Sequence, residues 1–212
     1  MKKKIIIFKN DRVGDLVHSV SAINKIIGEN KNTEILIFLS KINQKFYFLF
    51  KKNNTQLKIV NYHLNIIEKI KIFFYLLINK VEKVYILSPK GYYFFLPLFF
   101  FNIKFFGLCV NGIDGYKRPN LFLRKFLYKF IINDRETKKK RKSTGQLQLN
   151  LVNENKSPDI NLKLKLDIPK SNILKKYLPN EYFLIHYKKK IFEELGWGTE
   201  GLDLILTEIQ KY

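Results

Sequence analysis

A polar turn near the N-terminus contains residue types that can handle a ligand. In the stretch KNDRVGDLVHS, residues 9–19, Arg12, Gly14 and Asp15 come shortly after an apolar run at 5–8. A carboxylate can take a proton from a hydroxyl group, an arginine can bind an anion, and a glycine lets a ligand approach the backbone. Asp is also favoured at helix N-termini, so a capping role for Asp15 is an open alternative. The turn is therefore a candidate for acid–base chemistry or for anion binding.

The elements around this turn alternate between strand and helix. Helical patterns lie between short apolar runs, and because those runs are continuously apolar, both faces of their sheet should be covered. We therefore expect an α/β fold with a Rossmann-like, doubly wound parallel sheet, and the turn would lie at its carboxyl edge, where such folds bind ligands. The predicted strands are 4–8, 34–39, 57–60, 83–87 and 104–110, and the predicted helices are 16–27, 43–52, 64–80 and 91–100.

The second half of the chain has a different pattern. We predict a basic amphipathic helix at 121–132, a charged segment at 133–146 and a short helix at 147–155. An extended segment ends at Pro169, and beyond it a single strand and a single helix are predicted. One strand and one helix cannot bury their apolar faces alone. We therefore expect one domain at 1–168 and only the beginning of a second α/β domain at 169–212.

Composition limits the class of protein. The chain has 212 residues with 39 Lys+Arg and 18 Asp+Glu, a formal net charge of +21, and its 46% hydrophobic residues suffice for a packed core. The charge raises a nucleic-acid-binding alternative, although the sequence carries no signature of a known nucleic-acid-binding motif. The single cysteine, Cys109, excludes a disulfide framework and a cysteine-based zinc site. The apolar runs at 5–8 and 91–103 are too short for a secretory signal or a membrane span, so we expect a cytoplasmic protein.

The N-terminal motif resembles a known family. The stretch IIIFKNDRVGDLVHSVSAI is similar to the start of glycosyltransferase family 9, the heptosyltransferase-like enzymes, through Gly14-Asp15, His18 and the small-residue stretch that follows. Ser21 stands where the family usually has a proline. The segments EKVYILSP, residues 82–89, and KFFGLCVNG, residues 104–112, resemble later strands of the family. The resemblance extends over most of residues 1–190, and only its first motif is specific.

The resemblance implies a two-domain GT-B enzyme that inverts the sugar and needs neither metal nor cofactor. Its N-terminal domain would bind a lipopolysaccharide-type or other anionic glycan or glycolipid acceptor, and its C-terminal domain would bind a nucleotide-sugar, with heptose or a related sugar, as co-substrate. Asp15 would be the general base. The acceptor contacts implied are Arg12, Gly14, His18, Lys140 and Arg141, and the donor phosphate contact is Lys190. We expect these 212 residues alone to be inactive.

Several of these assignments have simpler alternatives. The basic stretch at 135–142 is equally a solvated loop, Lys188 and Lys189 compete with Lys190, and His18 is equally a packed helix residue. The helix at 121–132 either rests on the cytoplasmic face of the inner membrane or only covers the sheet. The alternative function is a basic Rossmann-like module that binds nucleic acid or a phosphate ligand without catalysis. Under the leading hypothesis no nucleic-acid partner is expected.

Overall fold

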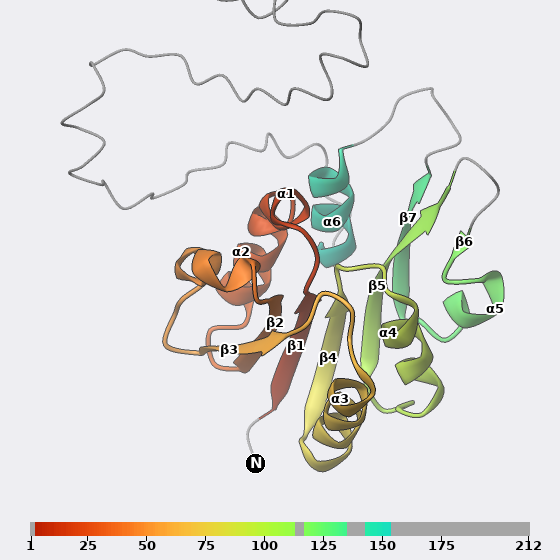
Figure 1. Cartoon of the computed structure of the whole chain (residues 1–212), viewed down its shortest axis with the longest axis horizontal. Coiled ribbons are helices and arrows are strands. Elements are labelled where there is room, and N and C mark those ends of the chain that lie inside the picture. Colours follow the sequence, from red (N-terminus) through yellow and green to blue (C-terminus); the bar gives the residue numbers. More distant parts are fainter. Residues whose placement is uncertain (1–2, 113–116, 135–142, 154–212) are drawn as a thin grey trace, which may run out of the picture. The chain divides into compact units, whose positions relative to one another are not determined.

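The computed structural model describes residues 3–112, 117–134 and 143–153 (Figure 1). Within these residues one mostly parallel sheet contains seven strands. The predicted second domain, 169–212, lies outside the described residues. The strands are β1 (Lys4–Lys9), β2 (Glu34–Ser40), β3 (Thr55–Val60), β4 (Val81–Ile86), β5 (Lys104–Asn111), β6 (Lys117–Arg118) and β7 (Lys129–Asp134).

The strand order confirms the doubly wound α/β fold. The order β3-β2-β1-β4-β5 is parallel throughout, with β7 parallel to β5 and the short β6 antiparallel to β5. The chain moves outward from β1 to β3 and then returns to the other side of β1 at β4. At this reversal the loops after β1 and β4 diverge, which is where open α/β sheets bind ligands. All five predicted strands are confirmed as β1 to β5.

Helices cover both faces of the sheet (Figure 1). One face packs against α1 (Val13–Val17), α2 (Val20–Glu29), α6 (Thr144–Val152) and the 3-10 helix η1 (Asn43–Leu49). The other packs against α3 (Ile66–Ile78), α4 (Gly91–Phe95), α5 (Leu121–Arg124) and the 3-10 helix η2 (Leu96–Leu98). None of the described helices is both long enough and apolar enough to cross a lipid bilayer.

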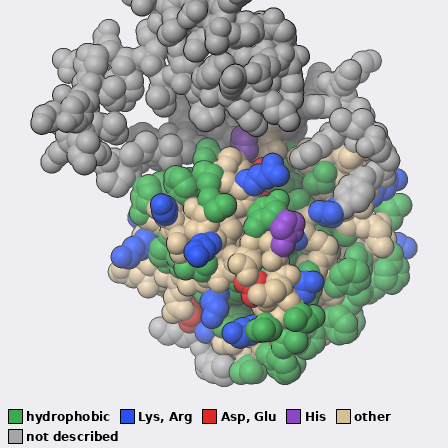
Figure 2. All heavy atoms as spheres, viewed as in Figure 1, with side chains coloured by type: hydrophobic (Ala, Val, Ile, Leu, Met, Phe, Trp, Pro, Cys, Tyr) green, Lys and Arg blue, Asp and Glu red, His purple; other side chains and the backbone are tan. Residues whose placement is uncertain are grey.

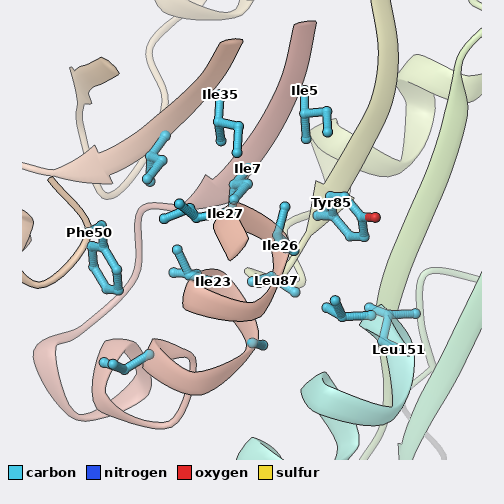
Figure 3. Close-up of a cluster of buried hydrophobic side chains, with 14 of the residues drawn as sticks. Ile5, Ile7, Ile23, Ile26, Ile27, Ile35, Phe50, Tyr85, Leu87 and Leu151 are labelled. Carbon is cyan, nitrogen blue, oxygen red and sulfur yellow. The ribbon is translucent and has the colours of Figure 1, made fainter. Parts of the chain in front are cut away.

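Alternate residues of each central strand serve the two faces. Ile5 and Ile7 of β1 belong to the core on the α2 side, whereas Ile6 and Phe8 belong to the core on the α3 side. Side chains alternate along a strand, so coverage of both faces requires the continuous apolar run seen in the sequence. Figure 3 shows the first core, in which residues of β1 and β2 face Ile23, Ile26 and Ile27 of α2.

Three sequence predictions differ from the structure. The segment 121–132 is not one amphipathic helix, because α5 ends at Arg124 and β7 begins at Lys129. The edge of β5 supplies six consecutive partners to β7, and these ladder hydrogen bonds outweigh the helical spacing of the apolar residues. The predicted helix at 16–27 is two helices, α1 and α2, with the break at His18 and Ser19. The charged segment predicted at 133–146 also includes the end of β7 and the start of α6.

Candidate active site

The carboxyl end of β1 carries a buried ion pair. The Nζ atom of Lys9 lies 2.7 Å from Oδ2 of Asp11, and it also donates to the carbonyl of Leu87 after β4 at 3.4 Å. Lys9 is 1% exposed, and this burial lowers the pKa of its amine, although the Asp11 carboxylate opposes the effect. Both charged side chains, Lys9 and Asp11, are therefore buried at the start of the turn that carries the predicted site.

The neighbouring residue, Asn10, ties three loops together. Its side-chain amide donates to the carbonyl of Asn61 at 2.8 Å, and its side-chain oxygen accepts from the hydroxyl of Tyr93 at 2.9 Å. The Lys90 amine donates to the backbone carbonyl of Asn10 at 2.9 Å and to the carbonyl of Tyr62, and it lies 4.1 Å from the centre of the Tyr62 ring. Burial lowers the pKa of Lys90 to about 8. The loops after β1, β3 and β4 are thus one hydrogen-bonded unit.

The other side of the turn is held by the end of β2. The backbone carbonyl of Asp11 accepts from the hydroxyl of Ser40 at 3.0 Å and from the amide of Asn43 at 2.9 Å. Both donors are buried. Because buried polar groups in such a network have few alternative partners, the backbone is fixed up to the residue before Arg12.

Helix α1 presents the predicted site residues on this support. Arg12 is extended, with φ −77° and ψ 161°, and its carbonyl accepts from the backbone of Leu16 at 3.0 Å. Leu16 is 1% exposed and anchors the helix in the core, whereas Arg12, Gly14, Asp15 and His18 are all exposed. The hydroxyl of Ser19 donates to the carbonyl of Asp15 at 3.0 Å.

Gly14 and His18 each refine a sequence interpretation. Gly14 does not adopt a positive φ, and a Cβ atom placed there would have no neighbour within 4 Å. The space beside Gly14 is therefore open to a ligand, and the fold itself does not require a glycine here. His18 ends α1 instead of lying on the face of a continuous helix.

The structure brings together four of the seven predicted site residues. Arg12, Gly14, Asp15 and His18 lie within one turn at the carboxyl edge of the sheet. Among the described residues none forms an ion pair with Asp15, so its exposed carboxylate is available to a ligand. The remaining three, Lys140, Arg141 and Lys190, lie outside the described residues.

Sequence reasoning missed the residues that support the turn. Lys9 carried a signal, since it is a charged residue that directly continues an apolar strand. Lys90 and Tyr93 carried none, because their contacts with Asn10 join positions 80 and 83 residues apart. Within the described part of the chain, no group of three or more His, Cys, Asp or Glu side chains could hold a metal ion.

The described domain is similar in fold to a solved structure. It is similar to the crystal structure of the glycosyl transferase family 9 from Veillonella parvula, with a TM-score of 0.52 and 15% sequence identity. The fold is that of a Rossmann-like GT-B N-terminal domain. The similarity covers 71% of this chain and 40% of that one, so the chain spans less than half the length of the solved enzyme. No protein-family model and no curated protein matches the sequence.

Proposed function

We propose that the protein is a glycosyltransferase in which Asp15 is the general base. The observation that carries the proposal is an exposed carboxylate in the first turn after β1, on an immobilised support and without an ion-pair partner among the described residues, in a fold similar to that of a family 9 glycosyl transferase. The substrates proposed are a nucleotide-sugar donor, with heptose or a related sugar, and an anionic glycan or glycolipid acceptor of the cell envelope. The exposed Arg12 side chain, three residues from Asp15, would bind an anionic group of the acceptor.

The proposed reaction is a single inverting displacement. The acceptor hydroxyl oxygen attacks the anomeric carbon of the donor, its proton passes to the carboxylate of Asp15, and the bond between the anomeric carbon and the diphosphate breaks. The nucleoside diphosphate leaves with the bonding electron pair, and Lys190 would stabilise its charge. The open space beside Gly14 would let the acceptor approach the backbone closely. Lys140 and Arg141 are proposed as further contacts to an anionic acceptor.

The test is Asp15→Asn in the full-length protein. The substitution removes the proton acceptor but keeps the size of the side chain, so we expect turnover to fall by about 10²- to 10⁴-fold. Because Asp15 is exposed, the free energy of unfolding should change by less than about 0.5 kcal/mol. Transfer is measured by mass spectrometry of the acceptor product with a panel of nucleotide-sugars, and unfolding is measured in urea by circular dichroism.

Glu29→Gln is the matched control, since Glu29 is also an exposed carboxylate but lies at the end of α2. It removes the same charge and should leave turnover unchanged. Normal turnover in Asp15→Asn would eliminate the base assignment. Equal losses in both variants would show that net charge, and not a positioned base, controls the rate.

A further inference from the structure

Helix α3 is apolar on almost all sides. Its sequence, IIEKIKIFFYLLI, contains only three charged residues, Glu68, Lys69 and Lys71. Ile72 and Leu76 are buried against the sheet. A surface helix normally places polar residues opposite its buried stripe, and a helix that is apolar all round is normally covered. The composition of α3 therefore points to a second contact on its outward side.

The outward side is a continuous stripe of large hydrophobic residues. Their spacing of i, i+1, i+4, i+8, i+11 and i+12 places them on one side of the helix, opposite the buried residues. Phe73 extends the stripe, because its ring lies 6.2 Å from Phe74 and 5.6 Å from the 63% exposed Phe99. We call the stripe the α3 outer face, and its residues, with their exposed fractions, are Ile66 (67%), Ile67 (58%), Ile70 (49%), Phe74 (52%), Leu77 (61%) and Ile78 (69%).

Contiguous exposed apolar patches of this kind mark interaction sites. Figure 2 shows hydrophobic side chains gathered over the lower part of the face where α3 lies, with Lys and Arg side chains among them. Helix α3 has 13 residues and is about 20 Å long at 1.5 Å per residue, too short to span a bilayer. A partner would therefore lie along the helix.

The charges around the α3 outer face are basic. Lys69 and Lys71 lie on the helix itself, and the exposed Lys80 follows it. The exposed Lys58 of edge strand β3 shares a sheet face with Val60, which packs in the same core as α3. The one acid of the helix, Glu68, accepts backbone N–H groups of Asn61 and Asn65 at 2.8 and 3.0 Å, so it is occupied as part of the N-terminal cap.

These charges indicate which partner could bind the α3 outer face. A second copy of the chain would bring another net charge of +21 against the same basic rim, which opposes self-association. An anionic lipid surface complements both features, since acyl chains accept apolar side chains and headgroup phosphates attract lysines. We propose that the α3 outer face binds the surface of an anionic lipid bilayer. This contact goes beyond the proposed catalytic function and does not depend on it.

The segment 121–132, for which a membrane contact was one of two possible roles, does not form the single amphipathic helix expected, so we place the membrane contact on α3 instead. Helix α3 is also connected to the candidate site. The loop that leads into α3 contains Asn61 and Tyr62, which bind Asn10 and Lys90. The loop into α3 and the turn that carries Asp15 therefore lie at the same carboxyl edge of the sheet, although α3 and α1 cover opposite faces.

The first test measures co-sedimentation of the full chain with vesicles. Wild type should bind vesicles of equal parts phosphatidylglycerol and phosphatidylcholine, and it should bind pure phosphatidylcholine at least tenfold more weakly. The double variant Ile70→Asn/Phe74→Asn keeps every charge but should bind the anionic vesicles at least tenfold more weakly than wild type. The matched control, Ile42→Asn/Phe48→Asn, replaces side chains that are 65% and 45% exposed away from α3, and it should bind like wild type.

A second readout reports insertion directly. Cys109 is the single cysteine of the chain, it is fully buried, and burial raises the pKa of its thiol to about 11. A thiol-reactive environment-sensitive dye should therefore label Phe74→Cys or Phe48→Cys selectively. Anionic vesicles should shift the emission of the dye at position 74 to the blue and leave the dye at position 48 unchanged.

Three results would overturn the proposal. The first result is a failure of wild type to bind anionic vesicles, which would be expected if another segment of the chain covers the α3 outer face. Equal vesicle binding by wild type and Ile70→Asn/Phe74→Asn would mean that lysines alone hold the lipid. A dimer of wild type that becomes a monomer in this variant, measured by analytical ultracentrifugation, would show that a second copy occupies the face. Circular dichroism of each variant confirms that the fold is retained.

Discussion

The ion pair between Lys9 and Asp11 shows how single residues support the candidate site. Removing two charges from water costs free energy, and a buried pair often stabilises a protein no more than apolar residues of similar size would. The pair lies at the end of β1, and it reaches Leu87 after β4, so it joins the two strands at which the sheet reverses direction. Its geometric effect is to fix the start of the turn that carries Asp15.

Lys90 gives this network a measurable pH dependence. Burial lowers its pKa from 10.5 to about 8 in the folded protein, so between these values the unfolded chain binds more protons than the folded one. The contribution of Lys90 to the free energy of unfolding should therefore rise as the pH increases from about 8 toward 10.5. The difference between wild type and Lys90→Met, measured by urea unfolding at pH 7.5, 8.5 and 9.5 (about these values), should increase along this series.

A second replacement checks that deprotonation causes the rise. Lys90→Arg keeps a positive charge that is not lost in this pH range. Its free energy of unfolding should fall further below that of wild type at each higher pH. A constant difference across the series for both variants would show that the Lys90 amine remains charged in the folded protein.

At the scale of elements, the backbone of α6 packs closely against the junction between α1 and α2, just after the turn that carries Asp15. A Cβ atom added at Gly145 would lie 2.9 Å from the carbonyl oxygen of His18, between α1 and α2. Backbone atoms cannot move aside as a flexible side chain can, so Gly145→Ala should displace α6 and lower the free energy of unfolding by about 1–3 kcal/mol. Urea unfolding followed by circular dichroism measures this loss.

Gly28→Ala is the control for the same change of residue type. Gly28 lies in α2, and a Cβ atom there would have no neighbour within 4 Å. The higher helix propensity of alanine should leave the protein unchanged or stabilise it by up to about 1 kcal/mol. Equal stability of the two variants would argue against close docking of α6 on the turn between α1 and α2.

The same scale explains what the sequence could predict. Strands β1, β2 and β5 are buried on both sides, so their apolar runs identify them without knowledge of their partners. The segment 121–132 has apolar residues that fit either a helix or a strand, and the edge of β5 decides in favour of β7. The position of Asp15 was predictable because the turn after β1 is local in sequence. The support from Lys90 was not, because folding alone brings it to Asn10.

At the scale of the whole molecule, the net charge of +21 acts through its distribution. Figure 2 shows Lys and Arg side chains scattered over the viewed face instead of gathered in one groove. A nucleic-acid-binding surface needs a continuous basic track, commonly with aromatic platforms for bases. On the face shown, scattered Lys and Arg side chains of the described residues produce only a general attraction to anions, which salt screens within about 8–10 Å.

This distribution predicts weak and salt-sensitive binding of nucleic acid. A fluorescein-labelled single strand of 20 nucleotides (about this length) should bind the full chain at low salt, and its affinity should fall at least 10²-fold between about 50 and 200 mM NaCl, because counterion release supplies the binding free energy. Strands of different sequence should give the same affinity in fluorescence anisotropy.

Vesicle binding through the α3 outer face should retain a larger share of its affinity over the same salt range, since apolar burial is not screened. A dissociation constant below about 1 µM at 200 mM NaCl, or a preference for one sequence, would instead support a nucleic-acid-binding module. The two salt titrations therefore distinguish general electrostatic binding of nucleic acid from specific binding of lipid by the apolar α3 outer face.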